Sequence, residues 1–144
     1  MLPKAAAWHA PLVLTFAAGP NAALLTLPDV TLFIADTDYE LLSVAEVHEV
    51  LGTNGSAVTL DIKKCTGVQA AASGTTMLAS TFDLKATVQT VVSKTLSNAG
   101  LTATAADRRL AAGNRLALDF TGTLTALAGV NVTVVLKRVR RPAY

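Results

Sequence analysis

The clearest hydrophobic pattern in the chain is a strict alternation over residues 57–64. Val58, Leu60 and Ile62 fall on one side of a pleated strand, and the residues between them are polar or charged. Because the side chains of a strand point alternately to its two faces, the pattern is typical of a half-buried strand. We therefore predict a strand here, with its apolar side facing a core.

An apolar, β-branched segment over residues 40–50 precedes this strand. Its alternation slips between residues 46 and 49, which predicts a bulge or a local twist at that point. The connection between the two segments contains Asn54 and Gly55, which readily adopt the positive φ of a tight turn. The sequence thus predicts a long β-hairpin over residues 40–64, which needs a partner sheet to be stable in water.

The remaining chain consists of short apolar segments separated by turn residues. We expect strands over residues 30–35, 40–50, 57–64, 76–81, 86–96, 101–105, 115–121 and 130–139. Residues 130–136 are apolar on both faces, which is typical of a central strand. Residues 103–112 are the helical candidate, which we interpret as a strand end plus a turn because Gly113 closes them. The pattern predicts an all-β fold, a jelly-roll-like β-sandwich of about eight strands with an extended N-terminal arm.

The first 28 residues carry one charge, that of Lys4. Pro11, Gly19 and Pro20 interrupt the stretch too often for a spanning helix, which needs about 20 unbroken apolar residues. We interpret it as an arm with a strand over residues 12–17, rather than a membrane anchor or a cleaved signal peptide. We expect three parts, namely the arm (1–28), a sandwich domain (29–139) and a C-terminal tail (140–144), since this length supports one core.

The composition is 51% hydrophobic and only 15% charged, against about 25% charged residues in an average soluble domain. Part of the surface is therefore neutral or apolar, as in a subunit with permanent neighbours, although an Ala- and Thr-rich monomer is the alternative. The net charge of +2 is far from the clustered basicity that binds nucleic acid through many phosphates, so we expect no direct nucleic-acid partner. The single cysteine, Cys65, is expected to be buried.

His48 is the residue most suggestive of chemistry, because Glu46 and Glu49 flank it and Asp61 lies in the next predicted strand. Such a group could form a metal site or an acid–base pair. On a strand, however, Glu46 and His48 share one face while Glu49 points away, and the other histidine, His9, is in the arm. We interpret the cluster as a solvated strand edge whose charges discourage edge-to-edge association. We expect no catalytic residues, no cofactor and no metal site.

Other motifs are also weak. The sequence contains neither a nucleophile elbow nor a phosphate-binding glycine loop. Asp36 and Asp38 are interpreted as a turn, because the Gly and distant Glu of a calcium loop are missing. Aromatic residues make up only 5% of the chain. We expect the four phenylalanines to fill the core, which leaves Trp8, Tyr39 and Tyr144 as surface aromatics, too few for a lectin site.

Three stretches taken together resemble a known group of proteins. They are residues 44–60 with their central turn, residues 101–105, and residues 110–120 running into 130–134. The stretches are similar to the small β-sandwich proteins encoded near the structural genes of tailed bacteriophages, which act as head decoration or cement proteins. The resemblance covers roughly residues 30–138 and implies a jelly roll, the phage's major capsid protein as partner, and no catalytic residues.

We therefore expect a non-enzymatic structural virion protein that binds the outer surface of a phage capsid and cements neighbouring capsomers. The alternative is a ligand- or carbohydrate-binding jelly-roll module of a virion appendage. We expect a homo-oligomer, a dimer rather than a trimer, and no contact with a membrane. The candidate contacts with capsid or subunits are apolar residues of the arm and basic residues near the C-terminus, namely Trp8, Leu12, Leu14, Phe16, Lys137, Arg138, Arg140 and Arg141.

Overall fold

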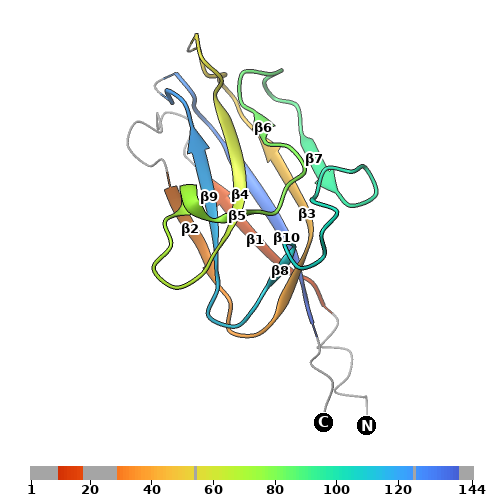
Figure 1. The fold of residues 1–144 in the computed structure, drawn as a ribbon. Coiled ribbons are helices and arrows are strands. Elements are labelled where there is room, and N and C mark those ends of the chain that lie inside the picture. Colours follow the sequence, from red (N-terminus) through yellow and green to blue (C-terminus); the bar gives the residue numbers. More distant parts are fainter. Residues whose placement is uncertain (1–9, 18–28, 54, 125, 140–144) are drawn as a thin grey trace, which may run out of the picture.

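The computed structural model describes residues 10–17, 29–53, 55–124 and 126–139, which form two antiparallel β-sheets packed face to face (Figure 1). The strands are β1 (Leu12–Ala17), β2 (Asp29–Ile34), β3 (Tyr39–Val47), β4 (Thr59–Cys65), β5 (Thr75–Thr76), β6 (Phe82–Asp83), β7 (Val92–Thr95), β8 (Arg109–Leu110), β9 (Arg115–Thr121) and β10 (Asn131–Arg138). A 3-10 turn, η2 (Ala71–Ser73), lies between β4 and β5. The predicted β-sandwich is confirmed. No helix in the described part of the chain is long and apolar enough to cross a bilayer.

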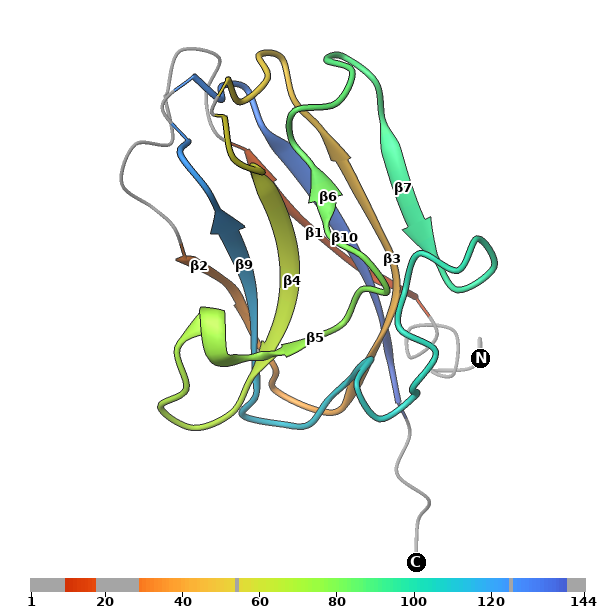
Figure 2. The ribbon, with the colours of Figure 1, turned by 45° about the horizontal axis from the view of Figure 1, so that its top comes forward.

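The order of the strands in the two sheets is that of a jelly roll. One sheet runs β1-β10-β3-β7, with β8 paired to the start of β3, and the other runs β2-β9-β4-β5, with β6 also paired to β4 (Figure 2). β7 and β8 share the position beside β3, while β5 and β6 share the position beside β4. The ten strands of the described residues thus occupy eight positions, four in each sheet.

β3 and β4 do not form the predicted hairpin, because they lie in different sheets. The connection between them crosses from one sheet to the other. On the way, the Gly52 N–H donates to the carbonyl of Leu84, and a Cβ on Gly52 would lie only 2.9 Å from the Val58 side chain. Alternation identified the buried face of β4 correctly, with Leu60 and Ile62 in the core, but not that of β3, where Glu46 is buried on the face predicted to be solvated. The pattern of a strand does not tell whether the next strand in the sequence pairs with it in the same sheet or packs against its buried face from the other sheet.

The irregularity in β3 lies earlier than predicted. The register with β10 shifts between Val135 and Leu136, whose partners are Ser43 and Leu41, so Leu42 is the extra residue of a bulge. The side chain of Leu42 is 41% exposed. Because a bulge inserts one residue, it moves the buried face of β3 from odd-numbered to even-numbered positions.

The core is filled from both sheets by side chains at alternate strand positions. Fully buried examples are Val44, Leu60, Ile62, Leu116, Leu118, Val132, Val134 and Leu136. β10 lies between β1 and β3, as the double-sided apolar pattern predicted. Burial of each such side chain contributes about 1.5–3 kcal/mol to folding. Phe82 and Phe120 are also buried, and Phe16 and Phe33 pack against this core, which confirms the expectation for the phenylalanines.

Three of the predicted strands are much shorter than expected. Of the range 76–81, only residue 76 belongs to a strand, as the end of β5, and of the range 86–96 only β7 is strand. In residues 101–105, Leu101 forms an isolated bridge with Leu78. Residues 103–112 contain a turn followed by β8, as predicted, and no helix. Because these edge strands are short, long loops make up most of the chain around β7.

Candidate interaction surface

The predicted contact residues of β1 belong to the sandwich itself. Leu12, Leu14 and Phe16 lie on the half-buried face of β1 and pack against the core. Val13 on the opposite face is 56% exposed. β1 pairs with β10 along its whole length, so this strand is fixed by its own chain. Trp8 lies outside the described residues, and a partner contact of these four predicted residues stays a prediction.

Tyr39 is buried rather than exposed, contrary to the expectation from sequence. Its side chain is only 2% exposed, and its ring meets that of Phe33 edge-on with 5.3 Å between centroids. The hydroxyl donates to Oδ1 of Asp36 at 2.7 Å. This hydrogen bond lowers the pKa of Asp36, while burial, followed by the bond to Asp36, raises the pKa of Tyr39. A phenol is buried here because the turn supplies a partner for its one polar atom.

The end of β10 joins this network through Arg138. Its Nε donates to the Tyr39 hydroxyl at 3.3 Å, and its Nη2 lies 3.5 Å from Oδ2 of Asp36. The guanidinium carbon also lies 5.8 Å from the centroid of the Tyr39 ring. Lys137 beside it is exposed, whereas Arg140 and Arg141 lie outside the described residues. Within the predicted basic cluster, Arg138 therefore contacts residues of its own chain, whereas the side chain of Lys137 is exposed to solvent.

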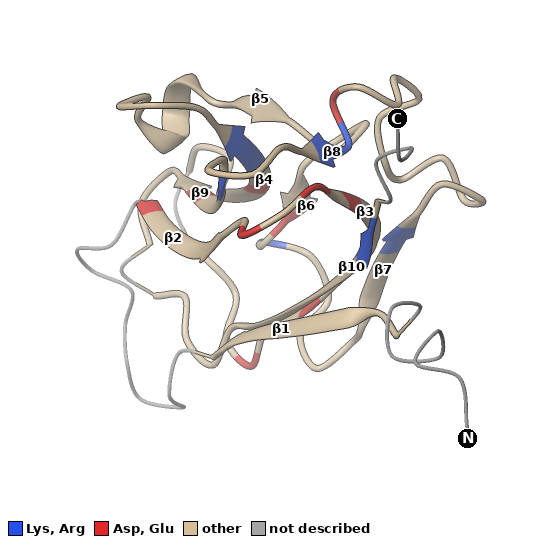
Figure 3. Cartoon of the chain, turned by 90° about the horizontal axis from the view of Figure 1, so that it is seen from below, with Lys and Arg blue, Asp and Glu red and all other residues tan. Residues whose placement is uncertain are grey.

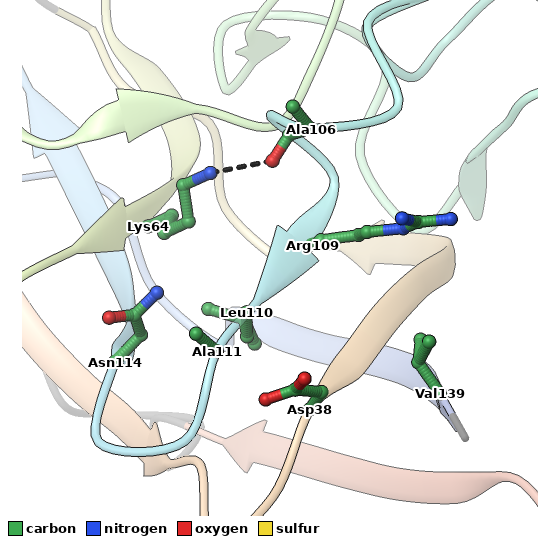
Figure 4. Close-up of a pocket in the computed structure, with 8 residues that line it drawn as sticks. All are labelled: Asp38, Lys64, Ala106, Arg109, Leu110, Ala111, Asn114 and Val139. Atoms are coloured by element: carbon green, nitrogen blue, oxygen red, sulfur yellow. Dashed lines mark hydrogen bonds between the residues drawn. The ribbon is translucent and has the colours of Figure 1, made fainter. Parts of the chain in front are cut away.

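A hollow of about 360 Å³ opens at this same end of the sandwich (Figure 4). It is lined by eight residues from the ends of several elements, namely Asp38, Lys64, Ala106, Arg109, Leu110, Ala111, Asn114 and Val139. Lys64 is the last residue but one of β4 and Arg109 begins β8, so two cations from opposite sheets line the same hollow. Sequence reasoning missed this hollow, since nothing in the spacing of these residues places them side by side.

The charges of the hollow are arranged on two sides. Nζ of Lys64 donates to the carbonyl of Ala106 at 2.7 Å, and Oδ1 of Asp38 accepts from the N–H of Ala112 at 3.1 Å. In Figure 4 the charged ends of Lys64 and Arg109 point away from each other on the two sides of β8, and the Asp38 carboxylate lies below them, apart from both. Figure 3 views the molecule from this end and shows Lys and Arg on β4, β8 and β10 with acidic residues between them. We name this surface, formed by Lys64, Arg109 and Lys137, the basic end.

The predicted solvated cluster at His48 is instead a buried pair. Nδ1 of His48 lies 2.9 Å from Oε1 of Glu46, its Nε2 lies 3.3 Å from the carbonyl of Ala86, and both side chains are 1% exposed. Burial raises the pKa of Glu46, with the hydrogen bond to His48 acting in the opposite direction. Glu49 turns away and accepts a hydrogen bond from Gln89. The pair is enclosed, so it holds the loop before β7 against β3 and does not reach solvent.

Asp61, which the hairpin would have placed near His48, lies in the other sheet. Its Oδ2 is 3.1 Å from Nζ of Lys63, which also lies 3.9 Å from Oδ2 of Asp119, and its Oδ1 accepts from the Thr76 hydroxyl. Burial, the largest cause, raises the pKa of Asp119. Among the described residues, no group of three His, Cys, Asp or Glu side chains is placed to hold a metal ion.

Comparison with known proteins gives a match at the level of fold. No family model matches the sequence, and a comparison with curated proteins found no match. One chain of a structure described as the cyanophage Pam1 capsid asymmetric unit aligns with a TM-score of 0.55 and 13% identity over 91% of this chain and 86% of that chain. Chains of infectious bursal disease virus, strains Gt and Gx, share 16% and 18% identity with TM-scores of only 0.23 and 0.22. This chain spans 38% and 37% of their lengths.

Proposed function

We propose that this protein is a structural component of a phage virion, which binds the outer surface of the capsid and cements neighbouring capsomers. The observation that carries the proposal is the shared fold with a chain of the cyanophage Pam1 capsid, over 91% of this protein. At 13% identity the similarity concerns the fold, and a fold alone does not determine function. The proposal of a role on the capsid therefore also depends on the contact surfaces that this protein exposes.

A protein that bridges two neighbours needs two separate contact surfaces on a stiff scaffold. The basic end is one, at the start of β3. The other surface is apolar and lies beyond the opposite end of β3, where Val50 and Val91 are 46% and 66% exposed. The loops that carry them are joined by a hydrogen bond from the Gln89 N–H to the His48 carbonyl at 2.8 Å. A strand of nine residues keeps the two surfaces roughly 30 Å apart.

Weak individual contacts suffice for this function. A capsid offers many equivalent sites, so a dimer that touches two capsomers gains from the high effective concentration of the second site. Every bound subunit also stabilises the assembled shell by linkage, because it binds the shell and not the free capsomers. A rigid sandwich in which only 15% of all residues are charged suits repeated contacts of this kind.

Self-association is part of the proposal. We propose a homo-oligomer, and a dimer in preference to a trimer. The apolar surface at Val50 and Val91 is then the contact between the two copies, and the dimer presents one basic end to each of two neighbouring capsomers. Sedimentation equilibrium of the purified protein should give twice the monomer mass of 14.9 kDa. Val91→Ser should return it to the monomer, whereas Val68→Ser, at a fully exposed valine elsewhere, should have no effect.

The test of the capsid role is binding to purified heads that lack this protein. The protein should sediment with the heads at a copy number that saturates at a multiple of the capsomer number. A reconstruction of the decorated particle should show it on the outer surface between capsomers. Saturation at a few copies per particle, together with binding to glycans, would instead support a ligand-binding module of a virion appendage.

A further inference from the structure

Two cations of the basic end differ from the cations next to them in sequence. Lys63 lies 3.1 Å from a carboxylate oxygen of Asp61, and Arg108 lies 3.7 Å from one of Glu40. Lys64 and Arg109, one residue further on in each case, have no ion-pair partner among the described residues and line the hollow. The fold thus neutralises one cation of each pair internally and presents the other to the hollow.

The acidic group of the hollow does not neutralise these two cations. Oδ1 of Asp38 accepts from the backbone N–H of Ala112, and its backbone carbonyl accepts from the N–H of Val139 at 2.8 Å. Figure 4 shows the Asp38 carboxylate apart from the charged ends of both Lys64 and Arg109. Two cations and one carboxylate line the hollow, which therefore keeps a net positive charge, and a low-dielectric wall strengthens the potential of such a charge.

The wall and floor are apolar, which suits a polypeptide better than a bare ion. Leu110 is fully buried beneath the hollow, and Ala106, Ala111 and Val139 are the other apolar residues of its lining. The volume of about 360 Å³ is at the low end of ligand sites, enough for a side chain or two. Exposed positive charge continues beyond the hollow at Lys137. An extended segment can place one acidic side chain in the hollow and another against Lys137.

We infer that the hollow between Lys64 and Arg109 is the docking site for an acidic polypeptide segment of the capsid protein, whose Asp or Glu carboxylates bind these two cations. The inference deepens the proposed function and depends on it for the identity of the partner. Guanidinium and ammonium groups form short charge-assisted hydrogen bonds with carboxylates, which gives the contact both affinity and register. Such a contact also accelerates association at low ionic strength.

The chemistry can be tested without the capsid. The probe is a synthetic peptide of alternating Glu and Ser, with a Gln–Ser peptide as control, titrated into the protein labelled with ¹⁵N. The acidic peptide should shift the amide signals of residues 64 and 106–111, and the control should not. Arg109→Gln should weaken binding about tenfold, as expected when one charged hydrogen bond is lost. Equal weakening by Lys85→Gln, which removes a charge near Ser56 at the other end, would overturn the inference.

Head binding separates this inference from the proposed function. If Arg109→Gln and the wild type decorate heads equally well, the docking site is wrong and the capsid role stands. If the wild type does not decorate heads, the capsid role fails and the peptide titration alone decides whether the hollow binds acidic chains. Citrate is the second probe, and binding of citrate with no gain for the peptide would overturn the assignment to a polypeptide. Thermal unfolding of each variant confirms that it is folded.

Discussion

His48 and Glu46 form a hydrogen-bonded pair inside the sandwich, with 2.9 Å between Nδ1 and Oε1. The second ring nitrogen of His48 lies 3.3 Å from the carbonyl of Ala86, which precedes β7 in the chain. The pair connects β3 to a loop that has little regular structure of its own. A buried polar pair of this kind is stable only while each atom has its partner.

The pair predicts a pH-dependent difference between wild type and Glu46→Gln. Because burial raises the pKa of Glu46 above 4.5, the folded state holds this proton more tightly than the unfolded chain. The stability from this group is present below about pH 4.5 and is lost as the pH rises through the folded-state pKa. The free energy of unfolding of Glu46→Gln should therefore rise, relative to wild type, as the pH is raised above about 4.5. Urea unfolding measures it.

Glu46→Ala serves as the companion variant. It leaves a buried ring nitrogen of His48 without its partner, which should cost about 1–3 kcal/mol at neutral pH. If the alanine and glutamine variants are equally stable at every pH, the pair contributes nothing and the loop is held by apolar contacts.

The alternation in β4 predicts unequal effects of truncation on its two faces. Ile62→Ala removes a fully buried side chain and should destabilise the protein by about 2–5 kcal/mol. Thr59→Ala, at a half-buried position on the other face, should change the free energy of unfolding by less than about 1 kcal/mol. Chemical denaturation compares the two. Similar losses at both positions would mean that β4 is packed on both faces.

Asn98 blocks the open edge of β7. Its Oδ1 accepts from the N–H of Thr95 at 2.8 Å and of Gly100 at 3.0 Å, and its Nδ2 donates to the carbonyl of Ser93 at 2.9 Å. We expect Asn98→Ala to cost about 1.5–4.5 kcal/mol, the sum of three hydrogen bonds that each contribute about 0.5–1.5 kcal/mol. It should also increase self-association in light scattering, because unpaired strand edges recruit other chains.

Asn98→Asp is the matched control for this edge. It keeps both acceptor bonds of the Asn98 side chain and loses the donor to Ser93, so its loss of stability should be the smaller of the two. Equal solubility of the alanine variant and the wild type would show that the loops around β7 protect the edge without Asn98.

The termini predict salt-sensitive attachment. Replacing Lys137, Arg140 and Arg141 by Gln should leave the unfolding free energy unchanged and weaken head binding, and added salt should weaken the wild type more than this variant. Arg138 is left in place, because its contacts with Tyr39 and Asp36 stabilise the fold.

Deletion of residues 1–10 stops before β1, and it should likewise reduce binding without unfolding the sandwich. Sedimentation with heads at two salt concentrations measures both.

Wild-type affinity in both variants would contradict a binding role of the termini. The contact would then have to involve the hollow or the apolar loops at Val50 and Val91. Circular dichroism on each variant checks that the strands are intact.

The class of the fold and the positions of its longest strands could be predicted from the amino-acid pattern alone. β1 and β9 begin and end at the predicted residues, because alternation of apolar side chains is a local property that each strand carries alone. The apolar residues on both faces of β10 likewise predicted its place between two other strands, since such a strand is unfavourable at a solvent-exposed edge. The core phenylalanines followed for the same reason.

Which strands are neighbours could not be predicted from the sequence and is known from the structure. β3 and β4 are consecutive and carry matching apolar faces, yet they pack across the core instead of side by side. The burial of Tyr39 and of Glu46 with His48 depended on partners supplied by turns and loops, which no alternation pattern encodes. The hollow at Lys64 and Arg109 arises where strands from both sheets end together. Such sites depend on long-range register, and the energy that fixes register is spread over the whole core.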